Sequence, residues 1–222
     1  VIDQSTGEVK AIVGGRGDKT ASKTLNRATD TTRQPGSTFK ILAAYSAALD
    51  AGGLTLASVQ DDAPYTYAGA NGKSVNNYDR RYRGFTTLRE AITDSINIVT
   101  VKTLAQAGVS LGWQYVQEYG FTTVDSRDMN EALALGGITQ GVSNLELTAA
   151  YAAIANQGTY IKPKFYTKIL DHDGNVLIDN TTPESHTVIK DTTAWLLTSA
   201  MEDVMTSGTG TSAYFGSSMA QA

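Results

Sequence analysis

The sequence of 222 residues predicts an α+β fold, in which several helices accompany β-hairpins. Two pairs of apolar runs are separated by turn-forming residues, which is typical of β-hairpins. Several longer apolar segments lie between helix-start and helix-end signals, which is typical of packed helices. Because apolar helices need a sheet to pack on and an isolated hairpin is marginal, we expect the sheet to be incomplete in this chain.

The predicted hairpins lie near the two ends of the chain. Residues 1–3 and 8–13 form strand-like runs around a Gln-Ser-Thr-Gly turn. Residues 165–170 and 175–178 flank an Asp-His-Asp-Gly turn, whose Asp-Gly pair favours a tight reversal. His172 is therefore expected to be a solvated turn residue.

Capping and turn signals divide the rest of the chain into helices and loops. Pro35 and Gly36 precede the first apolar run, and two capping boxes, at 87–90 and 143–146, open later helices. Asp191 is expected to cap the last helix. The predicted helices cover about 37–50, 87–93, 98–107, 110–119, 143–157 and 191–205.

The remaining stretches are expected to be connections. Residues 53–86 form a long polar section that contains several tyrosines, and residues 121–142 are irregular. Residues 207–218 are rich in Gly, Ser and Thr, and Tyr214 and Phe215 indicate that this connection is packed.

Composition limits the classes of protein that the chain can represent. With 41% hydrophobic and 18% charged residues, the chain is that of a globular protein. A net charge of −4 gives no basic surface for nucleic acid, and no apolar run is long enough to span a membrane. The chain has no cysteine, and its 2 histidines are distant in sequence, so neither a zinc cluster nor a Ser-His-Asp triad is indicated. We expect no metal and no organic cofactor.

The segment at 33–40, Arg-Gln-Pro-Gly-Ser-Thr-Phe-Lys, is the strongest candidate for catalysis. Ser37 lies where a helix is predicted to begin, and the free N–H groups there favour developing negative charge. Lys40 is three residues on and shares that helix face, and a lysine in apolar surroundings has a lowered pKa. Ser37 is therefore a candidate nucleophile and Lys40 its activating base. A helix cap beside a surface lysine is the other interpretation, because so short a pattern recurs by chance.

A second candidate lies at the interruption between two predicted helices. The Ser-Ile-Asn sequence at 95–97 places a hydroxyl and a carboxamide at a rigid junction. There Ser95 can relay a proton and Asn97 can bind a substrate amide. A Ser-Val-Asn sequence at 74–76 has the same spacing, but it lies in a loop rich in Gly and Asn, which favours the copy at 95–97.

Together these motifs resemble the transpeptidase domain of class A penicillin-binding proteins. Segment 33–40 is similar to the active-site segment of that family, and 95–97 is similar to its second motif. Further similar segments are 1–15, 141–146, 150–158 and 208–211. The third motif, Lys-Thr-Gly, does not occur in the 222 residues. We expect it directly after Ala222, on strands that a second fragment carries.

The resemblance implies an α+β fold of the penicillin-binding-protein and serine β-lactamase type, in which helices flank an antiparallel sheet and a subdomain is mainly helical. Residues 1–222 would form the N-terminal and central part of one transpeptidase domain of two lobes, with a helical lobe at roughly 53–160 and the C-terminal strands absent. The implied activity is that of an acyl-serine D,D-transpeptidase on the extracytoplasmic face of a bacterial membrane. Its implied partners are peptidoglycan stem peptides that end in D-Ala-D-Ala, and β-lactam antibiotics.

The resemblance also implies a role for each candidate residue. Ser37 would attack the carbonyl between the two terminal D-alanines, and Lys40 would take the Ser37 proton. Ser95 would pass a proton toward the leaving D-alanine, and Asn97 would hold the amide of the donor peptide. Tyr78 is expected to line the substrate cleft. The oxyanion would be held by the Ser37 N–H and by an N–H of the Lys-Thr-Gly strand, so these residues alone are expected to be poorly active.

Three other functions are compatible with the same residues. A D,D-carboxypeptidase would pass the acyl group to water instead of an amine. A serine β-lactamase would need an efficient deacylating base, for which Glu131 and Glu146 are candidates. A non-catalytic penicillin-sensing or scaffold domain would be acylated without forming cross-links.

Overall fold

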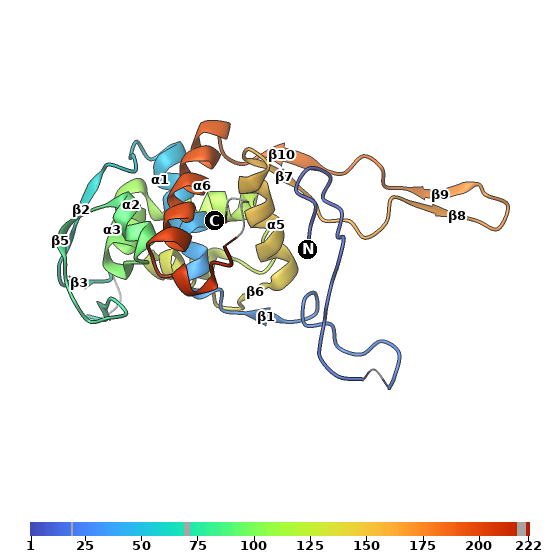
Figure 1. The fold of residues 1–222 in the computed structure, drawn as a ribbon, viewed down its shortest axis with the longest axis horizontal. Helices are drawn as coiled ribbons and strands as arrows, with labels where there is room; N and C mark the ends of the chain where they lie inside the picture. The colour runs from blue at the N-terminus through green and yellow to red at the C-terminus, as the bar shows by residue number, and fades with distance from the viewer. Residues whose placement is uncertain (19, 69–71, 217–220) are drawn as a thin grey trace.

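A helical segment over residues 36–50, which is buried from Phe39 to Ala48, lies at the centre of the molecule and carries Ser37 and Lys40 in its first turns. The other helices surround this segment, and a two-stranded arm projects from them (Figure 1). The structure is a computed structural model, which describes residues 1–18, 20–68, 72–216 and 221–222.

The elements of the described residues are as follows. The α-helices are α1 (Ser46–Asp50), α2 (Leu88–Thr93), α3 (Asn97–Ala107), α4 (Val109–Glu118), α5 (Asn144–Ala155) and α6 (Asp191–Thr206). The 3₁₀ and π turns are η1 (Gly36–Thr38), η2 (Ile41–Tyr45), η3 (Ser126–Asp128), η4 (Glu131–Leu135) and η5 (Thr211–Ala213). The strands are β1 (Thr32–Arg33), β2 (Val59–Asp62), β3 (Tyr65–Thr66), β4 (Ser74–Val75), β5 (Gly84–Thr87), β6 (Val142–Ser143), β7 (Thr159–Ile161), β8 (Lys168–Leu170), β9 (Val176–Asp179) and β10 (Ser185–Thr187).

The central segment changes its helix type along its length. It begins as the 3₁₀ turn η1, continues as the π-helix η2 and ends as α1. All five residues of η2 are buried, and the segment packs against α3, α4 and α6. The predicted helix at about 37–50 is thus present, but the tight and wide turns were not predicted. A run that is apolar on every side shows no periodicity from which they could be read.

The break between α2 and α3 is built as predicted. Thr87 caps α2 in a capping box with Glu90. α3 begins at Asn97, directly after Ile96, whose side chain is only 2% exposed and belongs to the core. The buried Ile96 anchors the junction, and Ser95 and Asn97 flank it.

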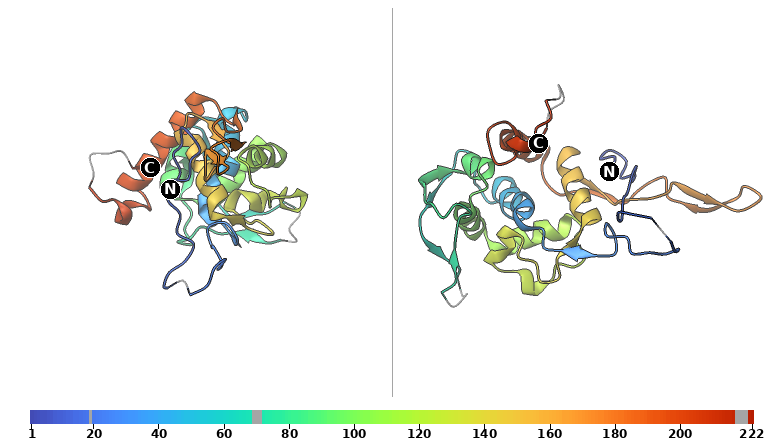
Figure 2. Two further views of the ribbon diagram at one scale, coloured as in Figure 1. Left: turned by 90° about the vertical axis from the view of Figure 1, so that its right-hand side faces the viewer. Right: turned by 60° about the horizontal axis from the view of Figure 1, so that its bottom comes forward.

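The strands of the described residues pair antiparallel and in twos. The predicted hairpin at 165–178 is confirmed as the pair β8–β9, which extends away from the helices as the arm (Figure 2). The predicted hairpin at 1–13 is reduced to one antiparallel bridge between Ile2 and Val9. The pairs β1–β6, β2–β5, β3–β4 and β7–β10 were not predicted. Strands of two to four residues are too short to show an alternating pattern.

The start of α6 corrects one predicted detail. The N-cap residue is Lys190, and no side chain caps the helix. The carboxylate of Asp191 accepts a hydrogen bond from the neighbouring Thr192 N–H at 2.7 Å. Asp191 is therefore not the cap but the first residue of the helix. At this position its negative charge interacts favourably with the helix dipole.

The connection after α6 is held against the helices by a backbone hydrogen bond. The Thr209 N–H donates to the Thr93 carbonyl at 3.2 Å, which ties this connection to the end of α2. Tyr214 and Phe215, which predicted the packing, are 48% and 70% exposed. Residues 217 and 218 of the predicted connection lie outside the described residues.

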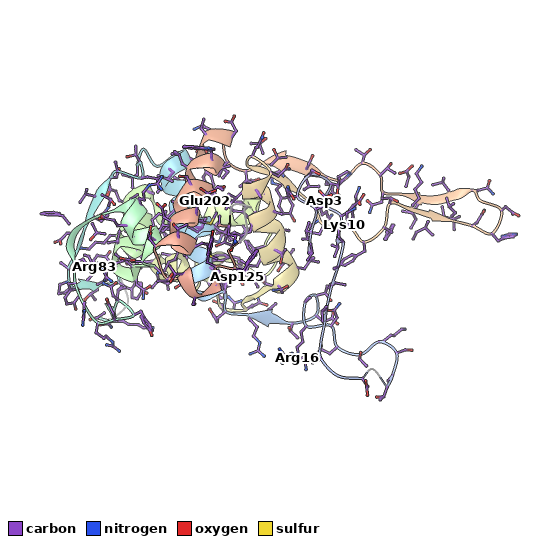
Figure 3. The ribbon with its side chains drawn as sticks, viewed as in Figure 1. Asp3, Lys10, Arg16, Arg83, Asp125 and Glu202 are labelled. Carbon is purple, nitrogen blue, oxygen red and sulfur yellow. The ribbon has the colours of Figure 1, made fainter. Side chains whose placement is uncertain are left out.

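Most charged side chains lie at the periphery, as Arg83 does at the left end and Arg16 at the lower edge of the view in Figure 3. Burying a charge costs free energy unless the charge is paired or neutralised, so each buried exception indicates a structural or chemical role. The buried exceptions among the described residues are Lys40, Asp62, Asp128, Glu131 and Lys164.

Candidate active site

Three of the predicted site residues line one hollow of about 350 Å³. Ser37 and Lys40 come from the start of the central segment, and Ser95 comes from the junction between α2 and α3. The rest of the described lining is mostly apolar and consists of Thr38, Ile41, Tyr45, Ile92, Tyr151, Met201, Val204, Thr209 and Ala222.

Lys40 is the polar centre of this hollow. Its side-chain amine lies 2.6 Å from the Ser95 carbonyl oxygen, 2.6 Å from Asn97 Oδ1 and 3.0 Å from Ser95 Oγ. Only 3% of Lys40 is exposed, and its hydrogen-bond partners among the described residues include no carboxylate. Burial without a counter-charge lowers the pKa of Lys40 to about 7.

The three partners of Lys40 suit a neutral amine. Two of them, the Ser95 carbonyl oxygen and Asn97 Oδ1, can only accept hydrogen bonds. They engage both N–H bonds of a neutral amine and leave its lone pair free. That lone pair can then face Ser95 Oγ, the third partner at 3.0 Å, so Lys40 is arranged to exchange a proton with a hydroxyl group.

Ser95 contacts Lys40 through two atoms because its backbone is left-handed. Its φ of 53° is uncommon for a residue other than glycine. In this conformation both the carbonyl oxygen and Oγ lie within 3.0 Å of the Lys40 amine. Backbone strain of this kind is concentrated at functional sites.

Asn97 is held from its other side. Its Nδ2 donates to the Asn76 carbonyl oxygen at 2.8 Å, which orients Oδ1 toward Lys40. Asn97 is also the first residue of α3, so its side chain projects from a rigid element. The predicted contact of Asn97 with a substrate amide can use its second N–H bond.

Ser37 lies on the exposed side of the turn η1, which precedes the buried Lys40. It is the middle residue of η1, and Gly36 before it has a φ of 58°, which glycine adopts without strain. The turn is fastened on the two sides of Thr38, since Thr38 Oγ1 donates to the Pro35 carbonyl at 2.7 Å and Tyr151 OH donates to the Thr38 carbonyl at 2.5 Å. The hydroxyl of Ser37 makes no hydrogen bond within the described part of the chain, which leaves it available to a substrate.

The structure thus brings Ser37, Lys40, Ser95 and Asn97 together, but not Tyr78. Tyr78 is 96% exposed and is not among the described residues that line the hollow. Its predicted contact with substrate therefore stays a prediction.

The two candidate deacylating bases are engaged elsewhere. Glu131 accepts from Tyr65 OH and from the Ala68 N–H, both at 3.0 Å. Glu146 forms the capping box of α5 with Ser143 and also accepts from Thr122. Neither glutamate belongs to the described lining of the hollow.

The loop around Asn76 and Asn77 was underestimated from the sequence. It was set aside as a chance copy of the second motif, yet the Asn76 carbonyl orients Asn97, and Asn77 Oδ1 accepts from the backbone N–H groups of Asn97 and Ile98. The signal that could have revealed it is the N-terminus of α3, where Ile96 stands in place of a capping side chain.

A serine at a helix start, beside a buried lysine that also contacts a second serine, is the arrangement of enzymes that transfer acyl groups through a serine. The family model described as "Penicillin binding protein transpeptidase domain" matches residues 1–220. The chain belongs to this family of penicillin-binding transpeptidase domains.

Individual relatives agree with this assignment. Penicillin-binding protein 1F of Bacillus subtilis is 40% identical over 219 residues, which are 99% of this chain and 29% of that protein. The crystal structure of penicillin-binding protein 1A from Haemophilus influenzae is similar with a TM-score of 0.74 and 27% identity, and the match covers 86% of this chain and 33% of that one. The PonA1 protein of Mycobacterium tuberculosis, solved in complex with penicillin V, shares the fold with a TM-score of 0.77 at 24% identity, over 92% of this chain and 54% of that chain.

The chain spans less than a third of the length of the curated relatives that it matches. In the part of the chain that the structure describes, no helix has both the length and the apolar character needed to cross a membrane.

Proposed function

We propose that this domain is an acyl-serine D,D-transpeptidase that cross-links peptidoglycan stem peptides and is acylated by β-lactams. The observation that supports this most directly is the Lys40 amine, which is buried without a carboxylate partner and lies beside Ser95 and Asn97 in the hollow that Ser37 lines. An amine with a pKa of about 7 can act as a base at neutral pH.

In the first half of the proposed reaction, the lone pair of Lys40 takes the proton of Ser37 Oγ. The oxygen attacks the carbonyl carbon of the D-Ala–D-Ala bond, and the negative charge develops on the carbonyl oxygen near the Ser37 N–H. When the C–N bond breaks, the amine of the leaving D-alanine takes a proton that passes from the Lys40 ammonium through Ser95 Oγ. The product is an ester between Ser37 and the donor peptide.

In the second half, the amine of a neighbouring stem peptide attacks the ester carbonyl. Its proton returns through Ser95 to Lys40, and Ser37 Oγ regains a proton as the ester bond breaks. Asn97 would hold the donor amide through its free N–H bond, and Tyr78, on the exposed loop beside it, would contact the more distant part of the substrate.

Several features of the whole protein belong to the same proposal. The second oxyanion donor would come from a Lys-Thr-Gly strand on a second segment, because the 222 residues contain no such sequence. The two lobes of the domain, with a helical lobe at roughly 53–160, would enclose the site between them. The longer protein would act on the outer face of a bacterial membrane, where peptidoglycan lies.

The lining of the hollow favours the transpeptidase over a serine β-lactamase. The described lining of the hollow contains no glutamate or aspartate that could activate water, and the hydrogen bonds of Glu131 and Glu146 hold them in other structural roles. A D,D-carboxypeptidase would use the same acylation chemistry and differs only in its acceptor. Product analysis with and without an acceptor amine separates the two.

The first test is an intact-mass spectrum of the full-length protein before and after incubation with benzylpenicillin. We expect a gain of one drug mass that maps to Ser37 and is absent in Ser37→Ala. The adduct should persist for many minutes, because the described lining of the hollow has no carboxylate that could activate water to hydrolyse the ester. A protein that stays unmodified, or one whose adduct maps to another residue, would contradict the proposed function.

A further inference from the structure

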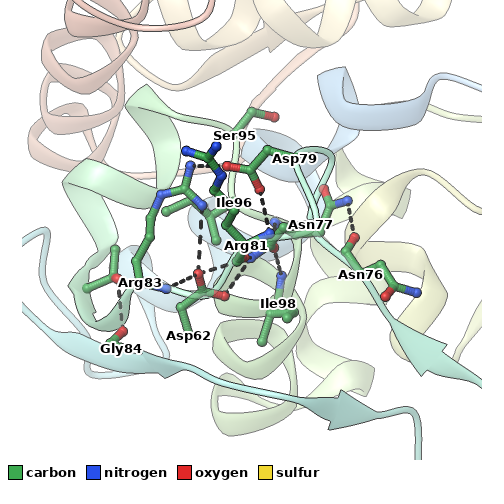
Figure 4. Close-up of polar contacts among 12 residues, drawn as sticks. Asp62, Asn76, Asn77, Asp79, Arg81, Arg83, Gly84, Ser95, Ile96 and Ile98 are labelled. Atoms are coloured by element: carbon green, nitrogen blue, oxygen red, sulfur yellow. Dashed lines mark hydrogen bonds and ion pairs between the residues drawn. The ribbon is translucent and has the colours of Figure 1, made fainter.

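We propose that Asn77, held by the buried carboxylate of Asp62, is a positioning residue that fixes Asn97 and thereby the Lys40 amine. This inference rests on the proposed function, because it assigns Asn77 and Asp62 a part in the acylation of Ser37. Neither residue lines the hollow; both act through the start of α3 (Figure 4).

Asn77 supplies the cap that α3 lacks in its own sequence. The first N–H groups of a helix have no partner inside the helix, and the residue before α3 is Ile96, which has no polar side chain. Asn77 Oδ1 accepts from the N–H groups of Asn97 and Ile98, both at 3.1 Å. A side chain from a loop twenty residues earlier in the chain therefore fixes the first turn of the helix.

Asp62 fixes the orientation of the Asn77 amide. Asn77 Nδ2 lies 2.7 and 2.9 Å from the two oxygens of Asp62 and 2.8 Å from the Arg81 carbonyl oxygen. These acceptors require the NH₂ end of the amide, so Oδ1 must face α3. Asp62 has no exposed surface, and its charge is supported by the Arg83 N–H at 2.9 Å and by the Arg83 guanidinium at 3.8 Å.

The same loop reaches Asn97 twice. Asn77 holds the Asn97 backbone, and the carbonyl of the adjacent Asn76 holds its side chain at 2.8 Å. The amide nitrogen of Asn97 makes this contact with Asn76, and the amide oxygen, Oδ1, lies 2.6 Å from the Lys40 amine. A continuous path of hydrogen bonds thus leads from the buried Asp62 to the proposed base.

Loss of the hydrogen bonds that Asp62 and Asn77 make would let the start of α3 move and would admit water to Lys40. Better solvation favours the ammonium form, so the pH at which half of the amine is neutral would rise. The other titratable side chains of the described lining are Tyr45 and Tyr151, and burial raises the pKa of both. They stay neutral through the neutral range and leave Lys40 as the group that a pH profile would report.

The experiment measures the rate of Ser37 acylation by benzylpenicillin from about pH 6 to pH 9, in the full-length protein and in the variants Asn77→Ala and Asp62→Asn. In the unsubstituted protein we expect the rate to rise with pH through a midpoint near 7, because the neutral amine is the base. In both variants we expect a midpoint roughly one unit higher. The neutral fraction at pH 7 then falls from about one half to about one tenth, so the rate falls about fivefold at pH 7 and recovers toward pH 9.

Thr87→Ala is the matched control. It removes the side chain that caps the neighbouring α2, a helix that has no hydrogen bond to Lys40 within the described part of the chain. We expect it to lower the melting temperature to a similar degree while the midpoint of the pH profile stays in place. Two further variants test rescue. Asn77→Asp keeps two acceptor oxygens for α3, but its carboxylate is repelled by the carboxylate of Asp62. Asp62→Asn combined with Asn77→Asp removes that repulsion.

Two outcomes would overturn the positioning role. One is an unchanged pH midpoint and rate in both variants. The other is a rate that falls by the same factor at every pH, which is the effect of a merely structural residue. Absence of any Ser37 adduct in the unsubstituted protein would instead count against the proposed function, so the two failures are distinguishable.

Discussion

The backbone conformation of Ser95 suits the proposed chemistry but costs stability. Its left-handed backbone, with a φ of 53°, costs roughly 1–2 kcal/mol for a residue that has a side chain. A glycine would adopt this conformation without that strain, but it would offer no hydroxyl. The strained serine places a carbonyl and a hydroxyl on one amine, which suits a proton relay better than it suits the fold.

Two substitutions of Ser95 separate these contributions. Both Ser95→Ala and Ser95→Gly remove the hydroxyl, so we expect acylation of Ser37 to slow at least about 100-fold in each. Ser95→Gly should be the more stable of the two by about 1 kcal/mol, because only alanine retains the strained backbone. Urea unfolding and acylation kinetics on both variants provide the measurement. Equal stability of the two would show that the left-handed conformation carries no strain here.

At the scale of the element, Gly136 lets η4 close on the turn of Ser37. It has a φ of 71°, and a Cβ at this position would lie 2.5 Å from the Gly36 carbonyl oxygen and 2.6 Å from the Gly36 nitrogen. Both distances are shorter than any ordinary contact, and both partners are backbone atoms that cannot move aside alone. η4 therefore supports the turn that carries Ser37, the proposed nucleophile, from behind.

Gly136→Ala should disturb that turn. We expect a loss of about 1–3 kcal/mol in the free energy of unfolding together with a clear fall in the rate of Ser37 acylation, because the turn must shift to admit the methyl group. Gly174→Ala is the control: its φ is 85°, but nothing lies within 4 Å of the added Cβ, and it lies in the turn of the β8–β9 arm. It should lose stability through backbone strain and keep its acylation rate. A normal rate in Gly136→Ala would refute the supporting role of η4.

The elements also show what a sequence can reveal. The capping boxes of α2 and α5 and the turn of β8–β9 were predicted because their signals lie within a few neighbouring residues. The pair β1–β6 joins Thr32 to Ser143, so nothing local indicates it. The residues of the candidate site differ in the same respect. The pairs Ser37 with Lys40 and Ser95 with Asn97 are local motifs, which the sequence reveals. The support from Asn77 and Asp62 depends on tertiary contacts between distant segments, which it does not.

At the scale of the whole molecule, the described residues form a helical body that carries one of the two proposed oxyanion donors. Ser37 lies at a helix start and offers its own N–H, while the resemblance assigns the second donor to a Lys-Thr-Gly strand that the sequence does not contain. The strands of the described residues pair only in twos, and the β8–β9 arm exposes apolar side chains such as Leu177, which is 64% exposed. The arm therefore offers a surface that further strands could cover.

This arrangement predicts a measurable difference between the 222 residues alone and a longer protein that includes the Lys-Thr-Gly strand. Loss of one oxyanion donor costs about 100- to 1000-fold in rate, so benzylpenicillin should acylate Ser37 of the shorter chain more slowly by that factor. Circular dichroism must first show that the shorter chain is folded, and Ser37→Ala in each form gives the background rate. If the folded shorter chain is acylated as fast as the longer protein, the second donor lies within these residues, and the assignment of the oxyanion site has to change.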